Sequence, residues 1–127
     1  MSDIDAVQLV RSLFTEQFTN WPGDAFSILA EDIVLQASGG QVYVGHEGYA
    51  QWYREQVQAN EDRGFVERGA ETIKPGWVMI SGETTTSRRD GDEFVQPGFW
   101  LVHVRDEFIA AVLFFRTEAE ARNALAR

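Results

Sequence analysis

Glu83 is the side chain whose type and position best suit acid–base chemistry. It lies in a run rich in Thr, Val and Ile that predicts a β-strand, and Ser81 precedes it by two positions, on the same face of that strand. Burial in an apolar pocket raises the pKa of a carboxyl group, which suits removal of a proton next to a carbonyl. Glu83 is therefore a candidate catalytic base, with Ser81 as its hydrogen-bond partner. The simpler interpretation is that Glu83 lies near the open end of its strand and is solvated.

Tyr53 is a second candidate catalytic residue. It belongs to a predicted helix over residues 46–58, in which Tyr49, Trp52, Tyr53 and Val57 share one face. Its hydroxyl could donate a hydrogen bond to a developing oxyanion. A tyrosine that packs in the core with its hydroxyl at the rim is the more common arrangement.

The two histidines give little support to a metal site. His46 and His103 are far apart in the sequence and lack the HExxH spacing that binds zinc. There is no cysteine, which excludes disulfides, thiolate catalysis and Cys-ligated metals. The sequence contains no phosphate loop, dinucleotide fingerprint or G-x-S-x-G motif. We therefore expect neither a metal nor a cofactor.

The elements that must position these residues follow from periodicity and turn signals. Helices are predicted over residues 3–20, 25–30 and 46–58, and short strands over residues 33–37 and 41–44. Residues 60–64 read as a polar loop, and four strands follow over residues 65–74, 77–88, 94–105 and 108–116, before a short terminal helix. This order predicts an α+β fold in which a curved antiparallel sheet wraps around the N-terminal helices.

The hairpin turns give an expected register. With Asp90-Gly91 at the centre of one turn, Trp100 lies opposite Ser81, and with Asp106-Glu107 at the centre of the next, Trp100 lies opposite Leu113. The face expected to pack against the helices then carries Trp77, Met79, Ser81, Glu83, Trp100, Val102, Val104, Ile109, Ala111, Leu113 and Phe115. His103 falls on the other, outer face. A bulge or bend is expected at Pro97-Gly98.

Large apolar side chains are expected to line a pocket between the helices and the sheet. The chain has four tryptophans in 127 residues, and large rings that face one another tend to leave concave space. The expected ligand-binding residues are Phe14, Phe18, Trp52, Met79, Ser81, Trp100 and Phe115. The alternative is that these side chains simply fill the core.

The outer face of the sheet is expected to be apolar in its middle and basic at its rim. A large apolar patch does not usually stay in contact with water. We therefore expect a homodimer in which two sheets pack face to face, with Leu101 in the interface.

Several stretches of the sequence resemble a known superfamily. An initial helix ends in Gly23-Asp24 and leads to a strand preceded by Asp32. A helix follows in VYVGHEGYAQWYREQV, and the chain ends in the hairpin WLVHVRDEFIAAVLFFRTEAEARNAL. Together these stretches resemble the nuclear transport factor 2-like superfamily, in its SnoaL-like and ketosteroid-isomerase-like branch, over nearly the whole chain.

The resemblance implies a cone-shaped, cystatin-like α+β barrel, one SnoaL-like domain over residues 1–127, with a deep pocket and often a homodimer. Members of the superfamily include isomerases, dehydratases, cyclases and epoxide hydrolases, and many others have no known activity. In dehydratase-like relatives an acid near the end of the first helix can line the pocket, which makes Asp24 a candidate catalytic residue. The alternative is that Asp24 caps the short second helix.

The last hairpin departs from the pattern of this superfamily. Its turn usually reads Asp-Gly, whereas this chain has Asp106-Glu107. Glutamate does not readily adopt the positive φ that glycine tolerates, so we expect this turn to be of another type.

Composition and charge exclude several classes of partner. The net charge is −9 and the basic residues are scattered, which argues against nucleic acid and anionic membranes. No segment approaches the roughly 20 apolar residues of a membrane span. The start of the chain, MSDIDAVQLV, lacks the basic region of a secretory signal, so we expect a cytoplasmic location.

The sequence favours a protein that binds a small apolar molecule in a pocket, because no paired acid–base set emerges from the spacing of its residues. The alternative is an acid–base enzyme, an isomerase, dehydratase or cyclase, acting on a steroid-, polyketide- or terpenoid-like substrate.

Overall fold

The structure, a computed structural model, describes residues 2–19, 25–88 and 90–126, with the backbone alone at residues 16–19, 60 and 61. The elements in order are α1 (Asp3–Thr19), α2 (Ala25–Ile28), β1 (Leu29–Gln36), β2 (Val42–Val44), α3 (Gly45–Ala59), β3 (Asn60–Lys74), β4 (Trp77–Arg88), β5 (Glu93–Arg105), β6 (Phe108–Phe115) and α4 (Glu118–Leu125). The predicted order is confirmed with two differences. The first strand begins four residues earlier than expected, at Leu29, and the expected polar loop after α3 is the start of β3.

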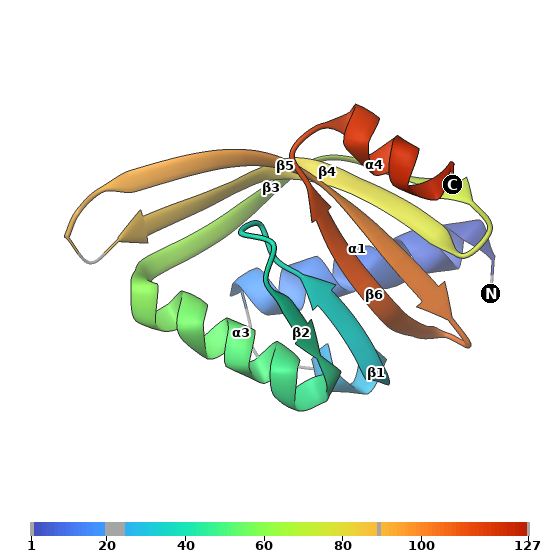
Figure 1. The fold of residues 1–127 in the computed structure, drawn as a ribbon, viewed down its shortest axis with the longest axis horizontal. Coiled ribbons are helices and arrows are strands. Elements are labelled where there is room, and N and C mark those ends of the chain that lie inside the picture. The colour runs from blue at the N-terminus through green and yellow to red at the C-terminus, as the bar shows by residue number, and fades with distance from the viewer. Residues whose placement is uncertain (1, 20–24, 89, 127) are drawn as a thin grey trace.

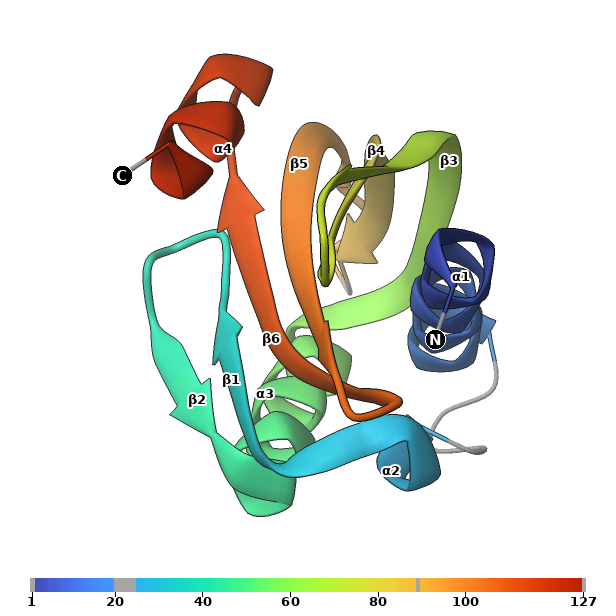
Figure 2. The ribbon, with the colours of Figure 1, turned by 90° about the vertical axis from the view of Figure 1, so that its right-hand side faces the viewer.

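The six strands form one curved, open sheet in the order β2-β1-β6-β5-β4-β3. Strands β1 and β6 are parallel, whereas the other neighbours are antiparallel. Helices α1 and α3 lie on the concave side, and α4 lies on the opposite side, against β5 and β6 (Figures 1 and 2). The expected α+β fold, a curved sheet wrapped around the N-terminal helices, is confirmed.

The register between β4 and β5 differs by one residue from the register that we expected. Trp100 lies opposite Ile80 rather than Ser81, and the pairing runs without a break through Pro97 and Gly98, so the expected bulge is absent there. A bulge occurs instead between His103 and Val104, where β5 pairs with β6. This bulge changes the partner of Trp100 from the expected Leu113 to Phe114. Because side chains alternate along a strand, these shifts exchange the faces of many residues.

The concave face holds a cluster of aromatic rings around Trp100. The ring centroids of Phe14, Phe65 and Phe114 lie 5.5, 5.5 and 5.3 Å from that of Trp100. Phe14 comes from the buried stripe of α1, Phe65 from β3 and Phe114 from β6. These edge-to-face contacts join α1 to the strands and form the centre of the core.

Two glycines that lie opposite each other, Gly82 on β4 and Gly98 on β5, make room for these rings. A Cβ atom at Gly98 would lie 2.5 Å from the Phe114 ring and 2.8 Å from the Trp100 ring. A Cβ atom at Gly82 would collide with the carbonyl oxygen of Val66 and lie 2.7 Å from the Phe65 ring. The aromatic cluster therefore requires glycine, which has no Cβ atom, at both positions.

The outer face of the sheet is partly covered by α4. Met79, Leu101 and Ala121 are buried there, and Leu113, Phe115 and Leu125 pack against them. Thr117 caps the helix by accepting a hydrogen bond from the Glu120 backbone N–H at 3.2 Å, and Arg122 pairs with Glu71 on β3 at 2.7 Å. Our placement of Met79, Leu113 and Phe115 against the N-terminal helices is wrong because the register is shifted.

The turn between β5 and β6 also differs from expectation. Asp106 and Glu107 adopt φ values of 52° and 69°, so both central residues are left-handed, as a type I′ turn requires. The chain thus places a glutamate where the hairpin geometry favours glycine, and it accepts the local strain.

We predict that Gly82→Ala and Gly98→Ala each destabilise the fold by about 1–3 kcal/mol, because an added methyl group overpacks the aromatic cluster. Gly82→Ala should cost more, since a backbone carbonyl obstructs the methyl group there, whereas side chains obstruct it at Gly98. Gly69→Ala is the matched control, because its Cβ would meet only Ser81 Oγ at an ordinary 3.7 Å. Urea unfolding measures all three. A Gly82→Ala variant as stable as Gly69→Ala would contradict the packing described above.

Candidate functional site

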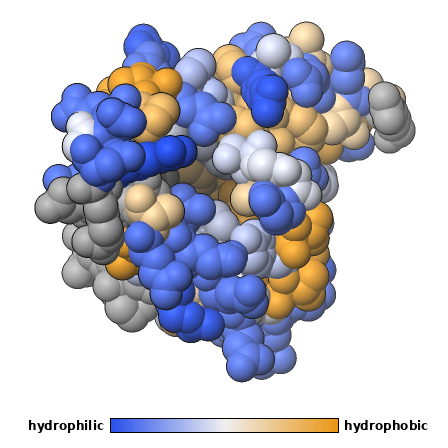
Figure 3. All heavy atoms as spheres, turned by 60° about the vertical axis from the view of Figure 1, so that its left-hand side comes forward, coloured by the Kyte–Doolittle hydropathy of each residue, from blue (hydrophilic) through white to orange (hydrophobic). Residues whose placement is uncertain are grey.

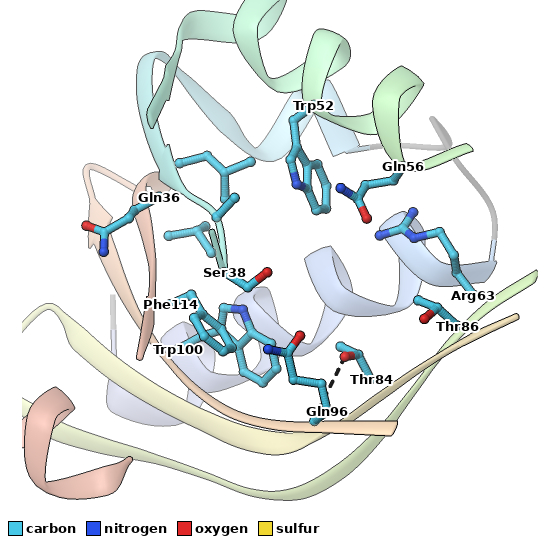
Figure 4. A pocket seen from close by; sticks show the side chains of 13 residues that line it. Gln36, Ser38, Trp52, Gln56, Arg63, Thr84, Thr86, Gln96, Trp100 and Phe114 are labelled. Carbon is cyan, nitrogen blue, oxygen red and sulfur yellow. Dashed lines mark hydrogen bonds between the residues drawn. The ribbon is translucent and has the colours of Figure 1, made fainter. Parts of the chain in front are cut away.

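A pocket of about 100 Å³ lies between α3 and the concave face of the sheet (Figure 4). It is framed by α3 on one side, by strands β3 to β6 on the other, and by the end of β1 and the turn after it. The lining residues are Leu35, Gln36, Ala37, Ser38, Trp52, Gln56, Arg63, Thr84, Thr86, Gln96, Trp100, Val112 and Phe114.

One part of the pocket wall is apolar. Trp100 and Phe114 belong to the aromatic cluster, and Leu35 and Val112 are buried beside them. Trp52 faces them from α3, with its ring held edge-on against the buried Tyr49 ring at a centroid distance of 5.5 Å. Flat, rigid rings on both sides of a hollow suit a flat apolar group.

The rest of the wall is polar. Figure 4 shows Gln56 and Arg63 on one side of the hollow, with Thr84, Thr86 and Gln96 along the rim of the sheet. The Thr84 hydroxyl donates to the Gln96 backbone carbonyl at 3.3 Å. Figure 3 shows a hollow on the same side of the molecule, with a hydrophobic interior and a hydrophilic rim. The arrangement can hold a molecule with an apolar body and an oxygen-bearing end.

Arg63 is the charged side chain among the described lining residues. Its guanidinium carbon lies 5.2 Å from the centroid of the Trp52 ring and 5.4 Å from that of Tyr53. Burial lowers the pKa of the Arg63 guanidinium, and the nearby Tyr53 and Tyr49 hydroxyls oppose this effect. The group stays charged at neutral pH, because an arginine starts from a pKa far above it. The pocket therefore contains a fixed positive charge that lies against aromatic rings.

The pocket opens into a wider groove along the β4–β5 hairpin. The groove has a volume of about 660 Å³ and shares Gln56, Thr86 and Gln96 with the pocket. Phe94 and Val95 line it and are exposed. A ligand larger than one ring could thus extend from the pocket into the groove.

Of the seven expected ligand-binding residues, Trp52 and Trp100 line the pocket. Phe14 is buried behind Trp100 and supports its ring. The side chain of Phe18 lies outside the described residues, as does the whole of Asp24.

The remaining expected residues on β4 and β6 lie on the outer face. The shifted register places Met79, Ser81 and Glu83 of β4 there, together with Phe115 of β6. The Glu83 carboxylate pairs with Arg68 at the surface, and the Ser81 hydroxyl lies 3.4 Å from the Gly69 carbonyl oxygen. Our placement of Glu83, Ser81, Met79 and Phe115 on the pocket face is therefore wrong.

Tyr53 does not belong to the described pocket lining. Its ring lies beside the Arg63 guanidinium instead, where it helps to hold that group. The two histidines lie elsewhere. His103 is on the outer face, as expected, with its ring stacked on Trp77 at 4.6 Å, and His46 Nε2 lies 3.0 Å from the Leu29 carbonyl oxygen.

Among the described residues, no group of three or more His, Asp and Glu side chains is placed to hold a metal ion. In the same part of the chain, no helix is long and apolar enough to cross a membrane.

Sequence reasoning missed most of the polar lining. The sequence predicts a loop at Arg63, whereas the structure has it as the fourth residue of β3, opposite Thr86. Phe114 and Val112 are absent from the face expected to pack against the helices, because the expected register is one residue away from the observed one. The small residues Gly82 and Gly98, which face each other across two strands rich in aromatic neighbours, are the signal that would have corrected the register.

Comparisons with known proteins identify the fold. No family model matches the chain, and no curated protein matches it in sequence. Many solved structures match in shape. A putative SnoaL-like polyketide cyclase from a Jannaschia species has 16% identity and a TM-score of 0.78, over 96% of this chain and 91% of that chain. An NTF2-like protein of unknown function from Burkholderia pseudomallei has 14% identity and a TM-score of 0.78, over 100% of both chains.

Two further structures are of a protein bound to a ligand and of an enzyme. TerC, co-crystallised with polyporic acid, has 10% identity and a TM-score of 0.78, over 97% of this chain and 99% of that chain. An LEH-like epoxide hydrolase from M. tuberculosis has 12% identity and a TM-score of 0.78, over 98% of this chain and 87% of that chain. At identities this low, the structural similarity establishes the fold and nothing about activity. The chain therefore has the cone-shaped α+β fold of the NTF2-like superfamily, which SnoaL-like and ketosteroid-isomerase-like proteins share.

Proposed function

We propose that this protein binds a small, flat, largely apolar molecule in the pocket between α3 and the sheet. The observation that carries the proposal is the composition of the wall, in which Trp52, Trp100 and Phe114 surround a hollow rimmed by amides and hydroxyls. Binding sites for small molecules are typically concave and apolar, with a few polar groups that orient the ligand.

The size of the site sets the class of ligand. A hollow of about 100 Å³ is smaller than the cavity of roughly 150 Å³ that holds benzene, so it accepts a single ring at most. The adjoining groove of about 660 Å³ gives space for the rest of a larger molecule. We propose a ligand with one ring in the pocket and its remainder along the β4–β5 hairpin, as a steroid, terpenoid or aromatic polyketide would lie.

The alternative is an acid–base enzyme of the isomerase, dehydratase or cyclase type. Two putative polyketide cyclases and an LEH-like epoxide hydrolase share the fold, which keeps this alternative open. Acid–base chemistry needs a proton acceptor within reach of the substrate, and the described lining residues include no carboxylate and no histidine. Asp24 remains the candidate base for this alternative, and Tyr53 the candidate donor. Binding is the better supported proposal.

A thermal-shift screen against steroids, terpenoids and aromatic polyketides tests the binding proposal, and a ligand should raise the melting temperature with its concentration. Trp52→Ala should weaken binding about tenfold or more, because it removes one wall of the pocket. Trp77→Ala is the matched control, since Trp77 packs on the outer face. An equal loss in both variants, or stabilisation by no compound in the wild-type protein, would contradict the proposal.

We also propose that the outer face of the sheet pairs with a second copy of the chain. Side by side across five strands lie Val44, Val34, Ala111, His103 and Trp77, in a row that continues beyond the part covered by α4. Val44, and Val42 on the same strand, are 62% and 58% exposed. A largely apolar row of this kind, with His103 as its polar member, presents the same residues to a symmetry-related copy and supports a face-to-face homodimer.

Light scattering after gel filtration tests the dimer. Val44→Glu should give a monomer, because it places a carboxylate in the proposed interface and costs the single chain little at an exposed position. Ile4→Glu, at a 74% exposed position on α1, is the control and should keep the mass of the wild-type protein. Leu101→Glu is not a useful test, because Leu101 is fully buried beneath α4. A Val44→Glu variant that stays dimeric would rule out this interface.

A further inference from the structure

We propose that the ligand carries a carbonyl group on the ring that enters the pocket, and that the indole N–H of Trp100 donates a hydrogen bond to the carbonyl oxygen. The inference rests on the proposed function, because it names a chemical group on the molecule that the pocket binds. It goes further than a largely apolar ligand, since it places a hydrogen-bond acceptor at the inner wall of the pocket and separates ketones from hydrocarbons of the same shape.

The burial of Trp100 is the first support. The residue is 9% exposed, and its indole N–H is a donor that cannot act as an acceptor. Among the described residues, no atom accepts a hydrogen bond from this N–H group. A buried indole N–H normally has an acceptor, because leaving it without one costs free energy. The acceptor therefore has to come from a water or a ligand in the pocket.

The direction of the N–H group is the second support. Figure 4 shows the indole nitrogen on the edge of the Trp100 ring that faces the hollow. In the described part of the chain, the fully enclosed side-chain polar atom without a hydrogen-bond partner is Thr72 Oγ1, so the Trp100 nitrogen is not sealed inside the core. Trp100 lines the pocket, and its N–H group reaches the pocket space. A ligand that displaces water from this point loses affinity unless it accepts the hydrogen bond itself.

The packing of the Trp100 ring is the third support. Its Cη2–Cζ3 edge lies over Gly98, where it occupies the space that a Cβ atom would need. The rings of Phe14, Phe65 and Phe114 surround it at centroid distances of 5.5, 5.5 and 5.3 Å. These contacts hold the ring in one orientation and so fix the direction of the N–H group. A donor that is already positioned loses little entropy when the ligand binds.

The neighbours of Trp100 in the wall determine which kind of oxygen fits. Leu35, Val112 and Phe114 line the pocket, and their side chains accept no conventional hydrogen bond. A hydroxyl group bound beside them could accept from the indole N–H, but its own proton would face side chains that cannot accept it. A carbonyl group only accepts hydrogen bonds and needs nothing further from this wall. The wall therefore favours a carbonyl group over a hydroxyl group.

Two uncharged probes of the same shape test the inference. 4-Phenylcyclohexanone carries a ring carbonyl, and 1-methylidene-4-phenylcyclohexane has an exocyclic methylene group in its place. A pocket without a donor would bind the hydrocarbon more tightly, because the ketone loses its hydrogen bonds to water. We expect the ketone to bind about tenfold or more tightly, since the hydrocarbon leaves the indole N–H without an acceptor. Titrations followed by the NMR signals of the tryptophan indole N–H groups measure both affinities.

The wild-type protein gives two readouts that depend on no variant. The infrared band of an isotope-labelled carbonyl group should lie at lower frequency in the bound ketone than in hexane, because a carbonyl that accepts a hydrogen bond absorbs at lower frequency. The ketone should also move the Trp100 indole proton downfield, as a new hydrogen bond does. The Trp77 signal should stay in place with both probes, because Trp77 lies on the outer face.

Three variants assign the preference to one residue. Trp100→Phe removes the N–H group and keeps an aromatic ring, so the two affinities should come to within about twofold of each other or favour the hydrocarbon. Trp52→Phe removes the indole N–H from the α3 side of the pocket and should weaken both probes alike, with the preference for the ketone kept. Trp77→Phe removes an indole from the outer face and should match the wild-type protein. If Trp100→Phe does not fold, the infrared band of the wild-type complex decides.

The outcomes separate the two proposals. Tighter binding of the hydrocarbon by the wild-type protein, an infrared band at its position in hexane, or a preference that survives Trp100→Phe would overturn the carbonyl assignment and leave an apolar binding pocket. Failure of both probes to move the Trp52 and Trp100 signals would refute the proposed function, and the carbonyl assignment with it.

Discussion

The packing of aromatic rings against two glycines, with Trp100 and Phe114 on Gly98 and Phe65 on Gly82, is the constraint on which the rest of the structure depends. The two glycines lie opposite each other on β4 and β5, and the rings of Phe65, Phe114 and Trp100 occupy the space that side chains would take. This packing holds the central strands against α1 and determines which alternate residues face the concave side. It therefore also determines which residues can line a pocket.

One consequence concerns which charged side chains reach the pocket. The Glu83 carboxylate lies on the outer face with Arg68, whereas Arg63, five residues before Arg68 on the same strand, reaches the pocket. The described lining of the pocket therefore includes a guanidinium and no carboxylate. The fold is shared with a putative polyketide cyclase and an LEH-like epoxide hydrolase, and a shared fold does not by itself carry function.

The architecture could be predicted from the sequence because it follows from local signals. Helical periodicity in α1 and α3 and the turn at Asp90-Gly91 gave the elements in their correct order. The site could not be predicted as well, because side-chain direction alternates with a period of two and a one-residue error inverts it. That error moved Glu83 and Met79 into the pocket and Phe114 out of it. Trp52 and Trp100 line the described pocket, and the position of Trp52 on a helix does not depend on strand pairing; that either residue binds a ligand stays a prediction.

The register around Trp100 is the central claim, and ring-to-ring nuclear Overhauser effects measure it directly. The structure predicts cross-peaks from the Trp100 ring to the rings of Phe14, Phe65 and Phe114, whose centroids lie within 5.5 Å of it. It also predicts cross-peaks between Trp77 and His103, which stack on the opposite face. Cross-peaks from Trp100 to the Met79 methyl group or to the Phe115 ring would place Trp100 on the outer face and contradict the pocket.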